Sequence, residues 1–334
     1  MTVPAQVLEA FALEGLPLTP ISVGLINRTF RVDRDGAPWL ALQELHPVFK
    51  GEVNLDLDAI TTHLAAQGLA TPRLHRTRTG APFLEADGRP WRALTWLPGC
   101  VHLAVSSPSI ARAAAGLVAR FHAATAGFVH AFAFERPGAH DTAAHLARLA
   151  AALDRGSPSV RVLGARILAH PLPAIPPLPT RIVHGDLKIT NILFDEEGTR
   201  AVALLDLDTL AYGTLATELG DALRSWCNPA GESAERVAVD EAIFAAAIEG
   251  YAAGDPGITA GEVAALVPGL ETIALELASR FCLDAIEDRY FGWDPTRFPS
   301  RVAHDERRAE AQLALAESVA AARPRLEARV ASAF

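Results

Sequence analysis

The sequence predicts an α+β fold in two lobes: a small N-terminal lobe with about five antiparallel strands and one main helix, and a larger, mostly helical C-terminal lobe. Two observations predict it. Short alternating segments separated by turn residues fill the chain up to Leu97, and helical periodicity dominates from about residue 106 onwards. We therefore assign residues 1–97 to the N-terminal lobe and residues 98–334 to the C-terminal lobe.

The elements of the N-terminal lobe follow from alternation, turn residues and helix stops. A short helix is expected first, and the main helix ends at Gly68. The predicted elements are a helix over 4–14, two strands flanking the loop 24–29, a strand over 38–43, a helix over 56–67, and strands over 83–85 and 91–97.

The C-terminal lobe reads as a series of helices interrupted by one hairpin. A proline-rich segment over 171–179 is interpreted as a rigid spacer that leads into the hairpin. The predicted helices cover 109–124, 140–154, 160–168, 217–226, 236–253, 260–288 and 303–329, and the hairpin covers 192–205.

Composition excludes several classes of function. Half of the residues are apolar, 21% are charged, and the net charge is −9. No Lys/Arg-rich block is present, which argues against nucleic acid or an anionic membrane as the main partner. The N-terminal residues lack the basic start of a signal peptide, no apolar run approaches a membrane span, and three scattered cysteines suit a reducing compartment. We expect a cytoplasmic protein.

The most specific pattern runs from His184 to Asn191 and is followed by Asp206 and Asp208. The hairpin between the two halves brings Asp206 back beside Asn191, so that carboxylates and an amide face one point. Such oxygen ligands suit Mg²⁺, and we predict Asn191, Asp206 and Asp208 as its ligands. Asp186 would then accept the proton of an incoming hydroxyl. Taken singly, each residue is explained as well by a turn or a strand end.

The same order occurs in the kinase catalytic loop, H-R-D-L-x-x-x-N followed by D-F-G, with Gly185 here in place of the Arg. The chain resembles the aminoglycoside phosphotransferase, choline kinase and homoserine kinase group, which has a protein-kinase-like bilobal fold, over about residues 20–320. The segment Glu218–Asp221 supports this resemblance. Segments over 24–30, 42–49, 279–281 and 290–291 are similar to the N-acetylhexosamine 1-kinase branch.

The resemblance implies an ATP- and Mg²⁺-dependent phosphotransferase and assigns roles to individual residues. Asp186 would be the catalytic base. Lys188 would either neutralise the γ-phosphate charge in the transition state or pair with a neighbouring carboxylate. The residues expected to bind the nucleotide are Gly24, Asn27 and Thr29 over the phosphates, Gln43 on the third strand, and Thr95, Trp96 and Leu97 at the adenine hinge.

The phosphate side departs from the kinase pattern. There is no G-x-G-x-x-G loop, and Gln43 stands where V-A-I-K has its lysine. Either Gln43 or Lys50 would take over the phosphate contact, and the acidic partner on the next helix would be Asp56 or Asp58. The alternative for Lys50 is a solvated surface lysine.

Gly185 and the absence of A-P-E after Asp208 argue against a protein kinase, because that Arg couples many kinases to an activation-loop phosphate. A small-molecule hydroxyl acceptor is expected instead. A sugar such as an N-acetylhexosamine is favoured over an aminoglycoside, choline or homoserine-type acceptor.

Acceptor residues are expected in the helical lobe near Asp186. Arg224, Arg280 and Trp293 are the main candidates, and Asp221 is interpreted as a structural support of the catalytic loop. The wider set of candidates comprises Glu218, Trp226, Asn228, Asp284 and Tyr290. Salt bridges or core packing would explain these residues as well. A different class also remains open, a non-catalytic nucleotide-binding pseudokinase module, favoured by Gln43 and the sparse glycine loop.

Overall fold

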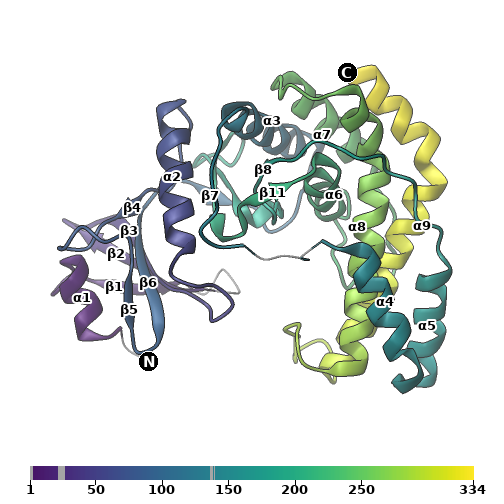
Figure 1. The fold of residues 1–334 in the computed structure, drawn as a ribbon, viewed down its shortest axis with the longest axis horizontal. Helices are drawn as coiled ribbons and strands as arrows, with labels where there is room; N and C mark the ends of the chain where they lie inside the picture. The colour runs from purple at the N-terminus through teal and green to yellow at the C-terminus, as the bar shows by residue number, and fades with distance from the viewer. Residues whose placement is uncertain (1–2, 22–26, 136–137, 139) are drawn as a thin grey trace.

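A computed structural model shows two lobes side by side, and it describes residues 3–21, 27–135, 138 and 140–334. The N-terminal lobe, purple to blue in Figure 1, is built on a sheet, and the C-terminal lobe, teal to yellow, is built from helices. The two chain ends lie at opposite sides of the molecule. The predicted α+β, protein-kinase-like architecture is confirmed.

The N-terminal sheet is antiparallel and is ordered β1-β2-β3-β6-β4, with β5 pairing the free part of β6. Its register places Thr29, Gln43 and Arg92 in one row across three strands. Residues directly opposite one another in an antiparallel pair project to the same face. The strands are β1 (Leu18–Ile21), β2 (Arg28–Arg34), β3 (Ala37–Glu44), β4 (Leu74–His75), β5 (Leu84–Ala86) and β6 (Arg89–Thr95).

Two helices flank this sheet. Helix α1 (Ala5–Phe11) covers one side and packs Phe11 into a core with Phe30, Leu40 and Trp91. Helix α2 (Val53–Ala66) stands between the sheet and the helical lobe (Figure 1). The apolar face of α2, which includes Ile60, belongs to the same buried cluster as the helical lobe. The proposed lobe boundary at residue 97 therefore separates two regions that share part of one core, and it stays a prediction.

The helical lobe is organised around the long helices α8 and α9, which pack along each other, with α8 lying between α6 and α9 (Figure 1). Helices α4 and α5 pack on α8, while α3 and α7 pack on each other. The helices are α3 (Pro108–Thr125), α4 (Thr142–Ala152), α5 (Pro158–Ala169), α6 (Leu215–Trp226), α7 (Glu241–Ala253), α8 (Ala260–Glu287) and α9 (Arg301–Ala333). In the part of the chain that the structure describes, every helix is too short or too polar to span a bilayer.

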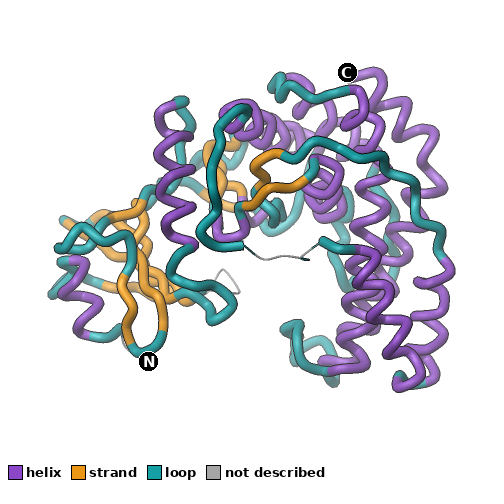
Figure 2. Tube along the Cα trace, viewed as in Figure 1, coloured by secondary structure: helices purple, strands orange, loops and turns teal. Residues whose placement is uncertain are grey.

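Two small sheets lie where the lobes meet, among the orange segments in the middle of Figure 2. One is ordered β7-β9-β10 and contains the predicted hairpin, and the other pairs β8 with β11. The short helical turns η2 (Ile189–Asn191) and η3 (Leu207–Thr209) adjoin them. The strands are β7 (Cys100–Val101), β8 (Arg181–Val183), β9 (Ile192–Phe194), β10 (Ala201–Leu204) and β11 (Ala211–Gly213).

Helix α6 is held unusually close to α8 by two glycines. A Cβ on Gly220 would lie 2.7 Å from the Gly269 carbonyl oxygen, and one on Gly269 would lie 2.2 Å from the Ala216 carbonyl oxygen. Only glycine permits such an approach. The contact fixes α6 against the lobe and thereby fixes Glu218 beneath the catalytic loop.

Candidate active site

The catalytic loop is anchored from below by one buried carboxylate. Glu218 accepts hydrogen bonds from the backbone N–H groups of His184, at 2.7 Å, and Gly185, at 2.9 Å. Burial opposes the charge on Glu218, but His122 and these contacts outweigh it, and the pKa of Glu218 is lowered. Glu218 therefore supports the loop, a role that the sequence analysis gave to Asp221.

Gly185 is required by the backbone of this loop. Its φ is +78°, and a Cβ would lie 2.6 Å from the carbonyl oxygen of Thr209. An arginine at this position would meet both the conformational penalty and the clash. The substitution that distinguishes the loop from H-R-D is therefore a consequence of its close packing on the segment after Asp208.

Asp186, Lys188 and Asn191 converge, and Lys188 forms the carboxylate pair that the sequence left open as the alternative to a phosphate contact. Lys188 Nζ lies 2.7 Å from Asp186 Oδ2, and Asn191 Nδ2 donates to the same oxygen at 3.1 Å and to the Asp186 carbonyl at 2.8 Å. Burial lowers the pKa of Lys188, but Asp186, with Asp206 and Asp221, outweighs it and raises that pKa. Lys188 is therefore a cation at neutral pH beside a partly exposed Asp186.

Asp206 and Asn191 present oxygens that suit a hard cation. Asp206 adopts a left-handed conformation, with φ +58°, and its carboxylate accepts no hydrogen bond from any described residue. Burial and the neighbouring Asp208 raise the pKa of Asp206 to about 6. Asn191 uses its amide nitrogen on Asp186, which leaves Oδ1 available. Within the described ranges, no cluster of three His, Cys, Asp or Glu side chains forms a metal site, but Mg²⁺ is commonly held by one or two protein oxygens and substrate phosphates.

Asp208 lies in a different environment from Asp206. It is 2% exposed, and both its oxygens are bonded to Arg92, with Arg92 Nη2 at 2.9 Å from Oδ2. Asn27 Nδ2 also donates to Asp208 Oδ2, at 2.7 Å. A role of Asp208 as a metal ligand would require these bonds to open, so that role stays a prediction.

Gln43 has the position expected on the third strand, but its partners are unlike those of the kinase lysine. It accepts from Arg92 Nε at 2.8 Å and donates to Thr29 Oγ1 at 3.1 Å. On α2, the side chain that faces this group is Asn54, whose Oδ1 lies 3.4 Å from Arg92 Nη1. Lys50 is exposed, as expected for a solvated lysine.

The two acids proposed as the helix partner point elsewhere. Asp56 accepts from the backbone N–H groups of Ala133 and Phe134 and pairs with His130. Asp58 pairs with Arg76 on the surface. Neither acid bonds to Gln43, so the expectation of an acidic partner at Asp56 or Asp58 is corrected: the amide of Asn54 stands in that place because the cation here is already neutralised by Asp208.

The predicted hinge is at the end of β6. The Thr95 N–H donates to Arg73 O at 2.8 Å, and the Trp96 N–H donates to Trp39 O at 2.9 Å. The backbone of Leu97 forms no hydrogen bond with any described residue, and its role as an adenine contact stays a prediction. Gly24 lies outside the described residues.

On the acceptor side, charged residues of both signs surround Asp221. Arg224 donates to Asp221 Oδ1 at 2.9 Å and to Glu232 Oε1 at 2.8 Å. Burial raises the pKa of Asp221, but Arg224, His140 and Arg280 outweigh it and lower it. Arg224 is thus committed to a nearly buried ion pair, with a side chain 8% exposed.

Arg280 is freer than Arg224. Its side chain is 25% exposed, and its ion pair with Glu276 is long, at 3.9 Å. Glu276 is engaged by Thr142 Oγ1 at 2.6 Å and by His140 Nδ1 at 3.1 Å. Burial lowers the pKa of His140, but Glu276 and Asp221 raise it above its usual value. Asp221, Glu276, His140 and Arg280 therefore form a mixed-charge group that reaches toward Lys188, here called the acceptor-side cluster.

The other acceptor candidates, apart from Trp293, take part in contacts that stabilise the fold. Trp226 is buried and donates to Leu187 O at 2.8 Å, which supports the catalytic loop. Asn228 bonds the turn at Gly231. Asp284 accepts from the backbone N–H groups of residues 289–291, including Tyr290. Trp293 is half-buried in the loop before α9.

Four residues of this region were not singled out from the sequence: Arg92, Asn54, His140 and Glu276. The contacts that place them in this region, Arg92–Asn54, Arg92–Asp208 and His140–Glu276, span 38, 116 and 136 positions. Only the register between β3 and β6, which places Arg92 opposite Gln43, offers a signal that sequence reasoning would reach.

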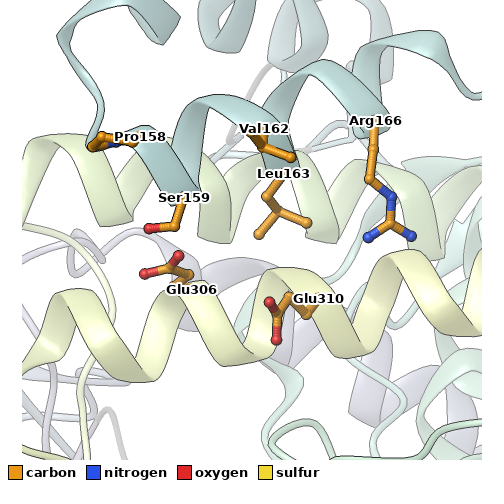
Figure 3. Close-up of a pocket in the computed structure, with 7 residues that line it drawn as sticks. All are labelled: Pro158, Ser159, Val162, Leu163, Arg166, Glu306 and Glu310. Carbon is orange, nitrogen blue, oxygen red and sulfur yellow. The ribbon is translucent and has the colours of Figure 1, made fainter.

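Two surface cavities lie apart from this site. One of about 440 Å³ lies between α5 and α9 and is lined by Leu163, Arg166, Glu306 and neighbours (Figure 3). Another of about 320 Å³ includes Lys50 and Glu85. Apart from Lys50, none of the predicted site residues lines either cavity.

Comparisons with known proteins agree with this geometry. Residues 17–256 match the phosphotransferase enzyme family. A homoserine kinase from Methylobacterium sp. (strain 4-46) is 28% identical over 236 residues, covering 67% of this chain and 70% of that protein. Other homoserine kinases, 29–33% identical, align over 50–80% of their own lengths. The predicted likeness to the N-acetylhexosamine 1-kinase branch stays a prediction.

Solved structures show the same fold. An aminoglycoside phosphotransferase from Alicyclobacillus acidocaldarius superposes with a TM-score of 0.63 and 16% identity, covering 98% of this chain and 97% of that one. The amicoumacin kinase hAmiN, in complex with AMP-PNP, Ca²⁺ and Ami, has a TM-score of 0.60 and 14% identity, with 88% and 87% covered. The chain belongs to the phosphotransferase enzyme family and acts on a hydroxyl group of a small molecule.

Proposed function

We propose that this protein is an ATP- and Mg²⁺-dependent kinase that transfers the γ-phosphate to the hydroxyl of a small zwitterionic acceptor of the homoserine type. The observation that carries the reaction type is the convergence of Asp186, Lys188 and Asn191 within hydrogen-bond distance. That set would provide a base, a cation and a metal-binding amide at one point.

The residues of this chain divide the work. Asp186 takes the proton as the acceptor oxygen bonds to phosphorus and the bond to ADP breaks. Lys188 stays charged and offsets the negative charge that develops on the transferred phosphoryl group. Asn191 Oδ1 and Asp206 would hold Mg²⁺, which when bound neutralises phosphate charge. The Leu97 backbone would receive the adenine edge.

The acceptor-side cluster supports the zwitterionic acceptor. Arg280 offers a guanidinium with little commitment, suited to a carboxylate, and Asp221 and Glu276 offer negative charge suited to an ammonium group. The names of the curated relatives agree with this class of acceptor. A sugar, favoured by the sequence alone, carries no carboxylate and would make no ionic contact with the partly exposed Arg280 guanidinium.

An ADP-release assay with a panel of acceptors tests the proposal. The panel contains L-homoserine, L-serine, choline, 1-amino-2-propanol, N-acetylglucosamine, N-acetylgalactosamine and an aminoglycoside. We expect the highest kcat/KM for an amino acid alcohol. A sugar with higher kcat/KM would contradict the acceptor assignment. Normal Mg·ATP binding without turnover of any acceptor would instead support the pseudokinase module.

A further inference from the structure

The strongest feature outside the catalytic loop is a buried ion pair that joins the two lobes. Arg92, on β6 of the N-terminal lobe, is 1% exposed, and Asp208, which follows the catalytic hairpin, is 2% exposed. Both guanidinium Nη atoms of Arg92 bond the two Asp208 oxygens. A bidentate pair of this kind fixes both distance and orientation between its elements.

Arg92 lies at the place that a kinase lysine serves. It is the cross-strand neighbour of Gln43 and bonds it through Nε. It also approaches Asn54 on α2, the helix that carries the acidic partner of that lysine in kinases. Among the described residues, Arg92 on β6 therefore supplies the positive charge that a kinase lysine would supply from β3, the neighbouring strand.

Asp208 connects this cation to two parts of the nucleotide side. It lies two residues after Asp206, and it accepts from Asn27 Nδ2 at 2.7 Å. Asn27 in turn accepts from the His46 N–H at 2.9 Å, so it ties the end of the predicted phosphate loop to the segment after β3 and to Asp208. We call Arg92, Asp208 and Asn27 the lobe bridge.

We propose that Arg92 is a positioning residue which, through Asp208, holds Asp206 and Asn27 in register for Mg·ATP, replacing the lysine–glutamate pair of kinases. Asp208 is then an anchor and leaves metal binding to Asp206 and Asn191. The inference rests on the proposed ATP-dependent activity.

The proposal and the alternative, in which Asp208 is a metal ligand, predict opposite changes in Mg²⁺ affinity when Arg92 is removed. If Asp208 binds Mg²⁺, removing Arg92 frees its carboxylate and should tighten Mg²⁺ binding. If Asp208 is an anchor, removing Arg92 releases Asp206 and Asn27, and Mg²⁺ and nucleotide binding should weaken. The direction of the change therefore separates the two roles.

The test compares R92Q, R92K, the double variant R92Q/Q43K, and R76Q as a matched control. Arg76 forms an ion pair with Asp58 in the same lobe, but that pair is exposed. Each variant is measured for equilibrium binding of Mg²⁺ with the non-hydrolysable analogue AMP-PNP, for the Mg²⁺ concentration giving half-maximal ADP release, and for KM of ATP and of acceptor.

We expect R92Q to raise the AMP-PNP Kd, the Mg²⁺ midpoint and the ATP KM by about tenfold or more, with the acceptor KM unchanged. In the double variant, the Gln43→Lys side chain is longer than the glutamine and carries its charge into the space left by Arg92, and we expect it to recover most of this loss. R92K should have an AMP-PNP Kd, an Mg²⁺ midpoint and an ATP KM between those of the native chain and those of R92Q. R76Q should match the native chain.

A folded R92Q with an unchanged or lowered Mg²⁺ midpoint would overturn the proposal. Should R92Q not fold, the double variant decides: native-like Mg²⁺ and nucleotide binding supports the proposal, and a folded double variant that still binds weakly contradicts it. Failure of the proposed kinase activity would show as absence of turnover in the native chain, whereas the AMP-PNP binding arm would still report on Arg92.

Discussion

Lys188 Nζ lies 2.7 Å from the Asp186 oxygen that also receives the Asn191 amide. The predicted base is therefore held by the Lys188 ammonium on one side and by Asn191, a predicted metal ligand, on the other. The Asp186 Oδ2 atom is thus contacted both by Lys188, the predicted phosphate-facing cation, and by Asn191. A change at Asp186 or Lys188 should therefore affect chemistry more than nucleotide binding.

Replacing Lys188 by methionine tests its role as the cation of the transition state. Because Asp186 raises the pKa of Lys188 and keeps it charged, K188M should lower kcat by about 10²–10³-fold with little change in ATP KM. K188R should retain more activity than K188M. Stopped-flow or coupled ADP release measures both, and a K188M kcat within about twofold of native would leave Lys188 without a catalytic role.

Arg280 should determine affinity for the acceptor. Removing its guanidinium takes away a charged hydrogen-bond donor, so R280M should raise the acceptor KM by about 10- to 100-fold while the ATP KM stays constant. The matched control is R289M, because Arg289 also pairs with a glutamate near the end of α8 but is 72% exposed. Equal effects of the two variants on acceptor KM would remove Arg280 from the acceptor site.

Asp305 makes the stability of the helical lobe depend on pH. It is fully buried on α9, and burial together with Asp284 raises its pKa to about 7, against the opposing effect of Arg308. The folded state therefore holds a proton that the unfolded state has lost above about pH 4. Its contribution is favourable at low pH and is lost as pH rises toward about 7.

D305N should reduce this pH dependence. Between about pH 5 and pH 8, the native chain should lose on the order of 2–4 kcal/mol more of its free energy of unfolding than D305N does. Urea unfolding across that range measures the difference. E306Q, a carboxylate-to-amide change one position along the same helix, is the control. Parallel pH profiles for native and D305N would contradict the raised pKa.

The sequence predicts the catalytic loop well because its chemistry is local. Asp186 and Asn191 lie in one short loop, and a hairpin returns Asp206 to them, so motif spacing is sufficient. The helices were also predicted to within a few residues in most cases, for example 260–288 against the observed Ala260–Glu287. Apolar periodicity and turn residues carry that information directly.

The lobe bridge was not predicted because its geometry is set by tertiary packing. Arg92 and Asp208 are separated by 116 positions, and only the strand register and the docking of the lobes bring them together. Likewise, Glu218 and Asp221 lie on one turn of α6, and the sequence assigned support of the catalytic loop to Asp221, whereas Glu218 accepts its backbone hydrogen bonds. Which of the two carboxylates faces the loop depends on the close packing of α6 against α8 at Gly220.

The measurement that tests the account most directly is ADP release and Mg·ATP binding by D186N. The account predicts that kcat falls by about 10³-fold or more, because the hydroxyl loses its base, while equilibrium binding of Mg·AMP-PNP stays within about threefold of native. D58N, which alters an exposed acid of the other lobe, should leave both unchanged. A folded D186N that retains native kcat would contradict the assignment of Asp186 as the catalytic base.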